Sequence, residues 1–133
     1  MLTHRTAPVA LAFGLAAVLA PGCGRAEPAA PGFACTGNEP GWRLDITGET
    51  ATFQSMLIDG TQTLAGTLTS LDYLDPALTV WRAEGGDADG PLVAVMTEGA
   101  CFDTMADGPA LTHRAVVSRT QDSVLAGCCN ATP

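Results

Sequence analysis

The sequence predicts an all-β fold, a small antiparallel barrel or a closely related sandwich, with seven to eight short strands stapled by two disulfides. Three observations support this prediction. Apolar and polar residues alternate along most of the chain after residue 33, which is the period of a half-buried strand. Turn-forming Gly, Asp and Pro residues interrupt the alternation at intervals of roughly eight to twelve residues. Four cysteines lie within the same region.

The first strands are predicted where the alternation is clearest. In the segment WRLDIT at residues 42–47, Trp42, Leu44 and Ile46 share one face, and this face is expected to point into the core. After a short turn, residues 52–57 continue in an extended conformation.

Later segments continue the pattern. A barrel would remove the exposed edges that so many short strands otherwise create. The only helix expected is a single turn within Asp103–Gly108. The further strands are predicted at residues 63–71, 77–84, 92–98, 113–118 and 123–129.

The start of the chain has the features of an export signal. A polar segment containing Arg5 precedes an uncharged run of twelve residues, 9–20, which is too short to span a bilayer because a spanning helix needs ~20. Residues 1–22 are therefore predicted to be a signal peptide. The segment LAPGC ending at Cys23 resembles the lipobox of bacterial lipoproteins, in which the cysteine is lipidated after cleavage. The alternative is an ordinary secreted protein that is cut a few residues later.

The remaining chain divides into two parts. Residues 23–32 are rich in Ala and Pro and are expected to form a flexible tether. Residues 33–133 are expected to form the β-barrel-like domain. Because Gly24 rather than Asp follows Cys23, the sorting pattern of lipoproteins predicts an outer-membrane protein facing the periplasm, if the host is Gram-negative.

The charge of the chain limits its partners. From residue 23 onward it carries five Arg, no Lys and fourteen Asp plus Glu, a net charge of −9 with His neutral. Such a surface repels nucleic acid and anionic lipid, and it attracts cationic partners. No nucleic-acid partner is therefore predicted, whereas a cationic protein or a small ligand is compatible. The alternative is that the charge serves solubility.

The cysteines predict two bridges. With Cys23 assigned to lipid, four remain in an exported chain, where disulfides form. Cys128 and Cys129 are adjacent, so their side chains point to opposite faces of a strand and each is expected to bond elsewhere. We favour Cys101 with Cys128 and Cys35 with Cys129, although the swapped pairing stays open. A metal or redox site is the alternative, but no C-x-x-C spacing is present.

Two acidic motifs have both chemical and structural interpretations. The segment Asp87–Gly90 resembles part of a calcium loop but lacks the register of an EF-hand, so a surface turn is preferred. Asp103 and Asp107 could bind a cation or act as an acid and base pair. Capping of a turn by their side-chain oxygens is the preferred interpretation. No metal or cofactor is predicted.

Three aromatic side chains are also candidates. His113 could serve as a general base, but a solvated strand histidine is preferred because no nucleophile motif is near. Trp42 and Trp81 are expected to pack in the core or at its rim, and the alternative is a ligand pocket at a barrel mouth.

Three ordered segments, ACTGNEPGWRLDI, CFDTMAD and LAGCC, carry a family resemblance. The chain resembles uncharacterised bacterial envelope lipoproteins with G-x-E-P-x-W, C-x-D-x-M-S-D and terminal G-C-C motifs, some of which occur with META-type or membrane-bound lysozyme-inhibitor domains. Ala106 departs from the second motif, where the family often has Ser. The resemblance implies an envelope location and a disulfide-stapled β domain. It also implies a candidate binding surface or structural knot at Asn38, Glu39, Trp42, Asp103, Met105 and Asp107.

These features predict a non-catalytic envelope lipoprotein, attached to a membrane by its lipid, that acts as a binding or structural module. One alternative is a lysozyme inhibitor, suggested by the acidic charge and the domains that accompany the family. The sequence lacks the S-G-x-x-Y inhibitory loop, because the segment holding Tyr73 has no glycine. A second, weaker alternative is a hydrolase that uses Asp103 and Asp107.

Overall fold

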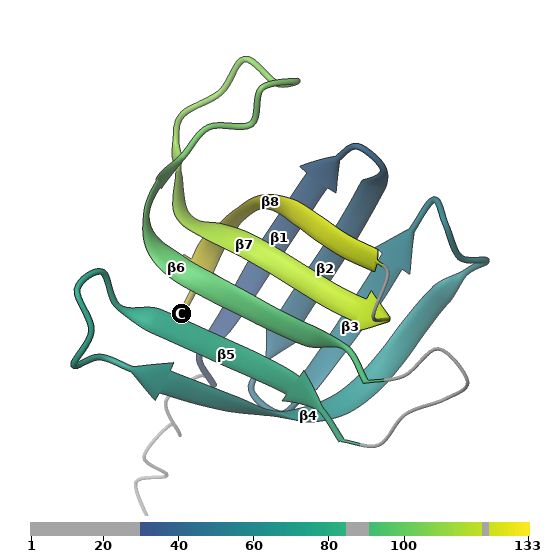
Figure 1. Cartoon of the computed structure of the whole chain (residues 1–133), viewed down its shortest axis with the longest axis horizontal. Coiled ribbons are helices and arrows are strands. Elements are labelled where there is room, and N and C mark those ends of the chain that lie inside the picture. The colour runs from purple at the N-terminus through teal and green to yellow at the C-terminus, as the bar shows by residue number, and fades with distance from the viewer. Residues whose placement is uncertain (1–29, 85–90, 121–122) are drawn as a thin grey trace, which may run out of the picture.

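A computed structural model describes residues 30–84, 91–120 and 123–133 of the chain, and these residues form a closed eight-stranded antiparallel barrel (Figure 1). Each strand pairs with the next along the chain, and the last pairs with the first. The all-β barrel expected from the sequence is confirmed. The strands are β1 (Gly32–Asn38), β2 (Gly41–Thr47), β3 (Thr50–Ser55), β4 (Thr61–Leu71), β5 (Leu78–Ala83), β6 (Val93–Cys101), β7 (Leu111–Thr120) and β8 (Ser123–Thr132).

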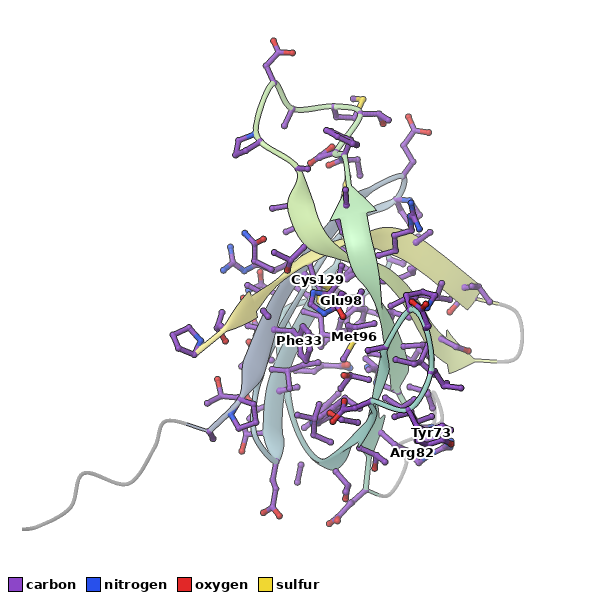
Figure 2. The ribbon with its side chains drawn as sticks, turned by 90° about the vertical axis from the view of Figure 1, so that its left-hand side faces the viewer. Phe33, Tyr73, Arg82, Met96, Glu98 and Cys129 are labelled. Carbon is purple, nitrogen blue, oxygen red and sulfur yellow. A yellow bond between two sulfur atoms is a disulfide. The ribbon has the colours of Figure 1, made fainter. Side chains whose placement is uncertain are left out.

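The alternation in the sequence becomes the inside and outside of this barrel. Trp42, Leu44 and Ile46 on β2 are buried as predicted, since alternate residues of a strand face opposite sides of the sheet. Figure 2 shows Phe33, Met96 and Cys129 gathered within the barrel wall. The interior is filled by side chains, and its fully buried members of largest volume are Trp81, Phe53, Leu44, Ile46, Leu92, Met96, Val117, Cys35 and Cys129.

Glycine allows the largest interior side chain to fit. A Cβ atom on Gly66 of β4 would collide with the Trp81 ring and with the carbonyl oxygen of Arg82 on β5. The Trp81 indole donates a hydrogen bond of 3.2 Å to the carbonyl oxygen of Gly48, so its one polar atom is satisfied although the side chain is fully buried. Trp81 is therefore a core residue, in agreement with the prediction that it packs in the core or at its rim.

The two disulfides follow the favoured pairing. Cys35 of β1 and Cys129 of β8 are register partners, and both are fully buried inside the barrel. Cys128 faces the other way and bonds to Cys101 at the end of β6. The adjacent cysteines thus carry one interior and one exterior bridge, which is the consequence expected from their opposite directions on a strand.

The connection from β6 to β7 is the most irregular part of the barrel. Strand β6 shifts register between Glu98 and Cys101, and Gly99 within this bulge has a φ of 142°, a conformation that favours glycine. Residues 102–110 then extend away from the barrel at the top of Figure 1. The single helical turn expected here is absent from the described residues. Instead, the Ala106 amide lies 3.4 Å from the Asp103 carbonyl oxygen in a turn.

Candidate functional site

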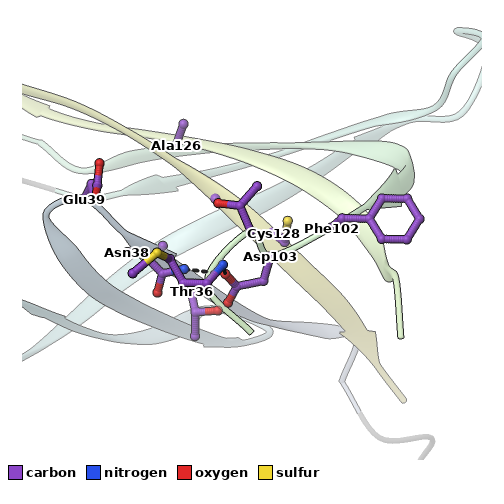
Figure 3. Close-up of a pocket in the computed structure, with 11 residues that line it drawn as sticks. Thr36, Asn38, Glu39, Phe102, Asp103, Ala126 and Cys128 are labelled. Carbon is purple, nitrogen blue, oxygen red and sulfur yellow. Dashed lines mark hydrogen bonds between the residues drawn. The ribbon is translucent and has the colours of Figure 1, made fainter. Parts of the chain in front are cut away.

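Residues of the three motif segments named above meet at a pocket on the outer wall of the barrel (Figure 3). One side is the end of β1 and the turn after it, another is the middle of β8, and the third is the start of the β6–β7 connection. The Cys101–Cys128 disulfide ties this connection to β8. The pocket has a volume of about 260 Å³ and is lined by Thr36, Gly37, Asn38, Glu39, Phe102, Asp103, Thr104, Met105, Ala126, Gly127 and Cys128.

Asp103 holds the two motif segments together. Its Oδ1 atom accepts a hydrogen bond from the Asn38 side-chain amide, marked in Figure 3, and a second of 2.9 Å from the backbone amide of Met105. The first bond spans 65 residues of sequence. The second is the turn-capping bond expected for an aspartate in this position. Asp103 therefore sets the position of the connection against β1.

Trp42 packs beneath three residues that line the pocket, Gly37, Ala126 and Gly127. The Trp42 indole donates a 3.2 Å hydrogen bond to the carbonyl oxygen of Ala126. A Cβ atom on Gly127 would lie 2.6 Å from the Trp42 ring, and one on Gly37 would collide with the same ring. Trp42 is buried, so it supports the pocket from beneath rather than lining it.

The lining combines negative charge with exposed apolar side chains. Glu39 and Asp103 are its charged members, and both are acidic. Phe102 is 69% exposed and Met105 is 70% exposed, although both are large apolar residues. In Figure 3 the Phe102 ring lies at the opposite side of the pocket from Glu39, and the Asn38–Asp103 pair lies between them. Glu39 and the Phe102 ring thus lie at opposite sides of the pocket, and Asp103 lies between them.

Most of the residues proposed from the motifs lie at this pocket. Asn38, Glu39, Asp103 and Met105 line it, and Trp42 lies beneath it. Asp107 is exposed and is not part of the lining, so the two aspartates of the second motif do not share this pocket. The lining residues that the sequence did not indicate as binding residues are Thr36, Gly37, Phe102, Thr104, Ala126, Gly127 and Cys128, of which Cys128 was predicted only as a disulfide residue.

A second hollow of about 300 Å³ lies at the start of β2 and the end of β3, lined by Gly41, Trp42, Arg43, Gln54, Ser55 and Met56. Its charged member, Arg43, forms an ion pair with Asp45, with 2.5 Å between Nε and Oδ2. The Arg43 Nε atom also donates a hydrogen bond to Asp45 within this pair, and this bond, together with the negative charge of Asp45, raises the pKa of Arg43. Neither a cysteine nor a carboxylate lines this hollow, so it offers fewer groups that could bind or react with a ligand than the first pocket.

His113 differs from its expected environment. It lies on the interior side of β7 with Ala115 and Val117, and it is half-buried rather than solvated. Its ring packs edge-on against Phe33, with 5.1 Å between ring centroids, and its Nδ1 atom is 2.8 Å from the Thr112 hydroxyl oxygen. The solvated position expected from the sequence is therefore wrong. Alternate residues of a strand face the same side, so His113 faces the interior together with Ala115 and Val117. It therefore closes the end of the core.

Within the described part of the chain, no group of three or more His, Cys, Asp or Glu residues is placed to hold a metal ion, and no helix is long and apolar enough to cross a membrane. The calcium-loop segment Asp87–Gly90, the signal peptide and Cys23 lie outside the described residues. No protein-family model, curated protein or solved structure matches this chain.

Proposed function

We propose that this protein is a non-catalytic envelope lipoprotein whose barrel binds a partner at the pocket on the outer wall of β1 and β8. The observation that carries the proposal is the meeting of two motif segments, 65 residues apart, around the Asn38–Asp103 hydrogen bond. Phe102 and Met105 support a binding role, because large apolar side chains that stay exposed beside a pocket are typical of interaction surfaces.

The geometry favours binding over catalysis. Acid and base catalysis by a carboxylate pair needs both groups near one reacting atom. Asp103 instead accepts two hydrogen bonds that fix the loop, and Asp107 is outside the pocket lining. The hydrolase alternative therefore gains no support from the positions of these two residues.

The proposed location has support from the chain itself. Two disulfides of the kind seen here form in oxidising compartments outside the cytoplasm.

The lipid at Cys23 is tested by the intact mass of the protein extracted from host membranes, with and without reductant. We expect a lipid-sized addition and a gain of four hydrogens on reduction, because two disulfides open. An unlipidated mass would contradict the anchor.

The binding role is tested by photo-crosslinking in the host. A photoreactive phenylalanine analogue at position 102 is expected to give a discrete adduct, because Phe102 lines the pocket. The same analogue at Tyr73 is the control, since Tyr73 is 82% exposed but does not line the pocket. The position-102 adduct should disappear in the Cys101→Ala/Cys128→Ala variant, which frees the loop. Identical adducts from both positions, or none from position 102, would overturn the proposal.

The lysozyme-inhibitor alternative is a narrower form of the same role. It is favoured by the acidic lining, since basic lysozymes would be attracted to it. A lytic assay decides it: slowing of lysis by equimolar protein that is lost in Glu39→Gln supports inhibition, and unchanged lysis excludes it.

A further inference from the structure

We infer that the pocket recognises a guanidinium group, an arginine side chain presented by an extended segment of a basic partner protein. This inference rests on the proposed binding function and adds the chemistry of what is bound. Three features of the pocket support it: the state of its two carboxylates, its size and shape, and the apolar side chain at its far end.

The carboxylates of the pocket are available to a cation. Both hydrogen bonds that the Asp103 carboxylate accepts from described residues fall on Oδ1, which leaves Oδ2 for a ligand. Glu39 is exposed and forms no ion pair with any residue in the described part of the chain. The hydrogen bond from Asn38 holds the Asp103 carboxylate beside Asn38, and Glu39, which carries the second carboxylate, is the next residue in the chain. A ligand that donates to both would pair two acidic groups that have no basic neighbour in the lining.

The size of the pocket favours a side chain over a whole metabolite. Its volume of about 260 Å³ is below the ~300–1,000 Å³ that is typical for drug-sized ligands. Its lining runs along the wall from Glu39 past Asp103 to Phe102 (Figure 3). Such an arrangement suits an extended chain that places one side chain between the carboxylates and an apolar neighbour against Phe102.

The choice of arginine follows from hydrogen-bond geometry. A guanidinium is planar and presents several N–H donors in a fixed fork, so it can pair with a carboxylate through two parallel bonds. A lysine ammonium can pair as a point charge only. The net charge of −9 from residue 23 onward would also raise the rate of encounter with a basic protein.

The test is an amide NMR titration of the oxidised protein with three pentapeptides, acetyl-Ala-Leu-Xaa-Leu-Ala-amide, in which Xaa is arginine, lysine or citrulline. We expect the arginine peptide to shift amide signals at residues 36–39, 102–105 and 126–128 and to bind more tightly than the lysine peptide. Citrulline has nearly the shape of arginine without its charge and should bind at least about tenfold more weakly. Binding should weaken as salt is raised.

Variants separate a specific pocket from a general charge effect. Glu39→Gln should weaken the arginine peptide by about tenfold. Glu49→Gln is the matched control, because Glu49 is also exposed, its replacement makes the same change in net charge, and it does not line the pocket. Equal weakening by both variants, shifts spread over the whole surface, or equal binding of arginine and citrulline would each overturn the inference.

The two proposals can fail separately. If the photoreactive residue at position 102 forms its adduct and Glu39→Gln leaves that adduct unchanged, the pocket binds a partner but does not recognise a cationic group. If the arginine peptide binds as expected and no adduct forms in the host, the pocket binds a guanidinium group, but the proposed binding of an envelope partner is wrong. Failure of both experiments removes the binding function itself.

Discussion

Replacement of Cys35 and Cys129 by alanine is expected to lower the free energy of unfolding by about 4.7 kcal/mol, nearly the whole stability of a small domain. The bridge closes a loop with a sequence separation of 94 residues, so its removal gives the unfolded chain much more conformational freedom. Both cysteines are fully buried, and alanine would also leave unfilled volume in the core. Urea denaturation of the wild type and the double variant, followed by tryptophan fluorescence, measures the difference.

The exterior bridge provides the comparison. Cys101→Ala/Cys128→Ala opens a loop with a sequence separation of 27, for which the same model gives about 3.5 kcal/mol. This bridge joins the last residue of β6, where the β6–β7 connection begins, to β8, and both strands also pair with β7 through backbone hydrogen bonds. The barrel should therefore persist, while the connection that forms the third side of the pocket loses its covalent link to β8. A Cys35→Ala/Cys129→Ala protein within about 1 kcal/mol of the wild type would show that strand pairing alone closes the barrel.

Trp81→Ala is expected to destabilise the barrel by about 3–5 kcal/mol. Trp81 is the largest fully buried side chain, and truncation removes its contacts in the core together with its hydrogen bond to Gly48. Gly66 cannot fill the space because it has no side chain to repack. Urea unfolding followed by far-UV circular dichroism measures the loss, since the variant lacks one of the two fluorescent tryptophans.

The control for this variant is Tyr73→Ala. Tyr73 is 82% exposed on the β4–β5 connection, and its removal should change the free energy of unfolding by no more than about 0.5 kcal/mol. Trp81→Phe should cost less than Trp81→Ala because the phenyl ring retains part of the packing. Equal stability of Trp81→Ala and Tyr73→Ala would contradict the packed interior described for this barrel.

The sequence predicted the strands whose apolar residues alternate, and it missed β1. The segment from Gly32 to Asn38 contains small and polar residues, so its pattern alone does not identify a strand. It is a strand because β2 and β8 both pair with it and its addition closes the barrel. Closure depends on partners distant in the sequence, and local periodicity carries no information about them.

The sequence predicted some residues of the candidate site, but neither its full lining nor its three-dimensional arrangement. The motif residues were identifiable, and the opposite directions of the adjacent Cys128 and Cys129 side chains predicted two separate bridges. The pairing that the structure has was the favoured one of two, but the directions alone did not exclude the swapped pairing. The pocket itself depends on the bulge at Gly99, which redirects the chain after β6, and on the bond between Asn38 and Asp103. These features determine that Asp107 lies outside the pocket and Phe102 inside its lining, and neither position follows from spacing in the sequence.

The bridge between β1 and β8 also determines how the barrel responds to mechanical force. A pull on the chain ahead of residue 32 acts first on the backbone hydrogen bonds at the start of β1, which could be broken one after another. Cys35 lies three residues beyond the first residue of that strand, and its bond to Cys129 passes the load covalently to β8. Peeling would therefore stop at Cys35, and the rest of β1 could yield only if the sheet sheared as a unit.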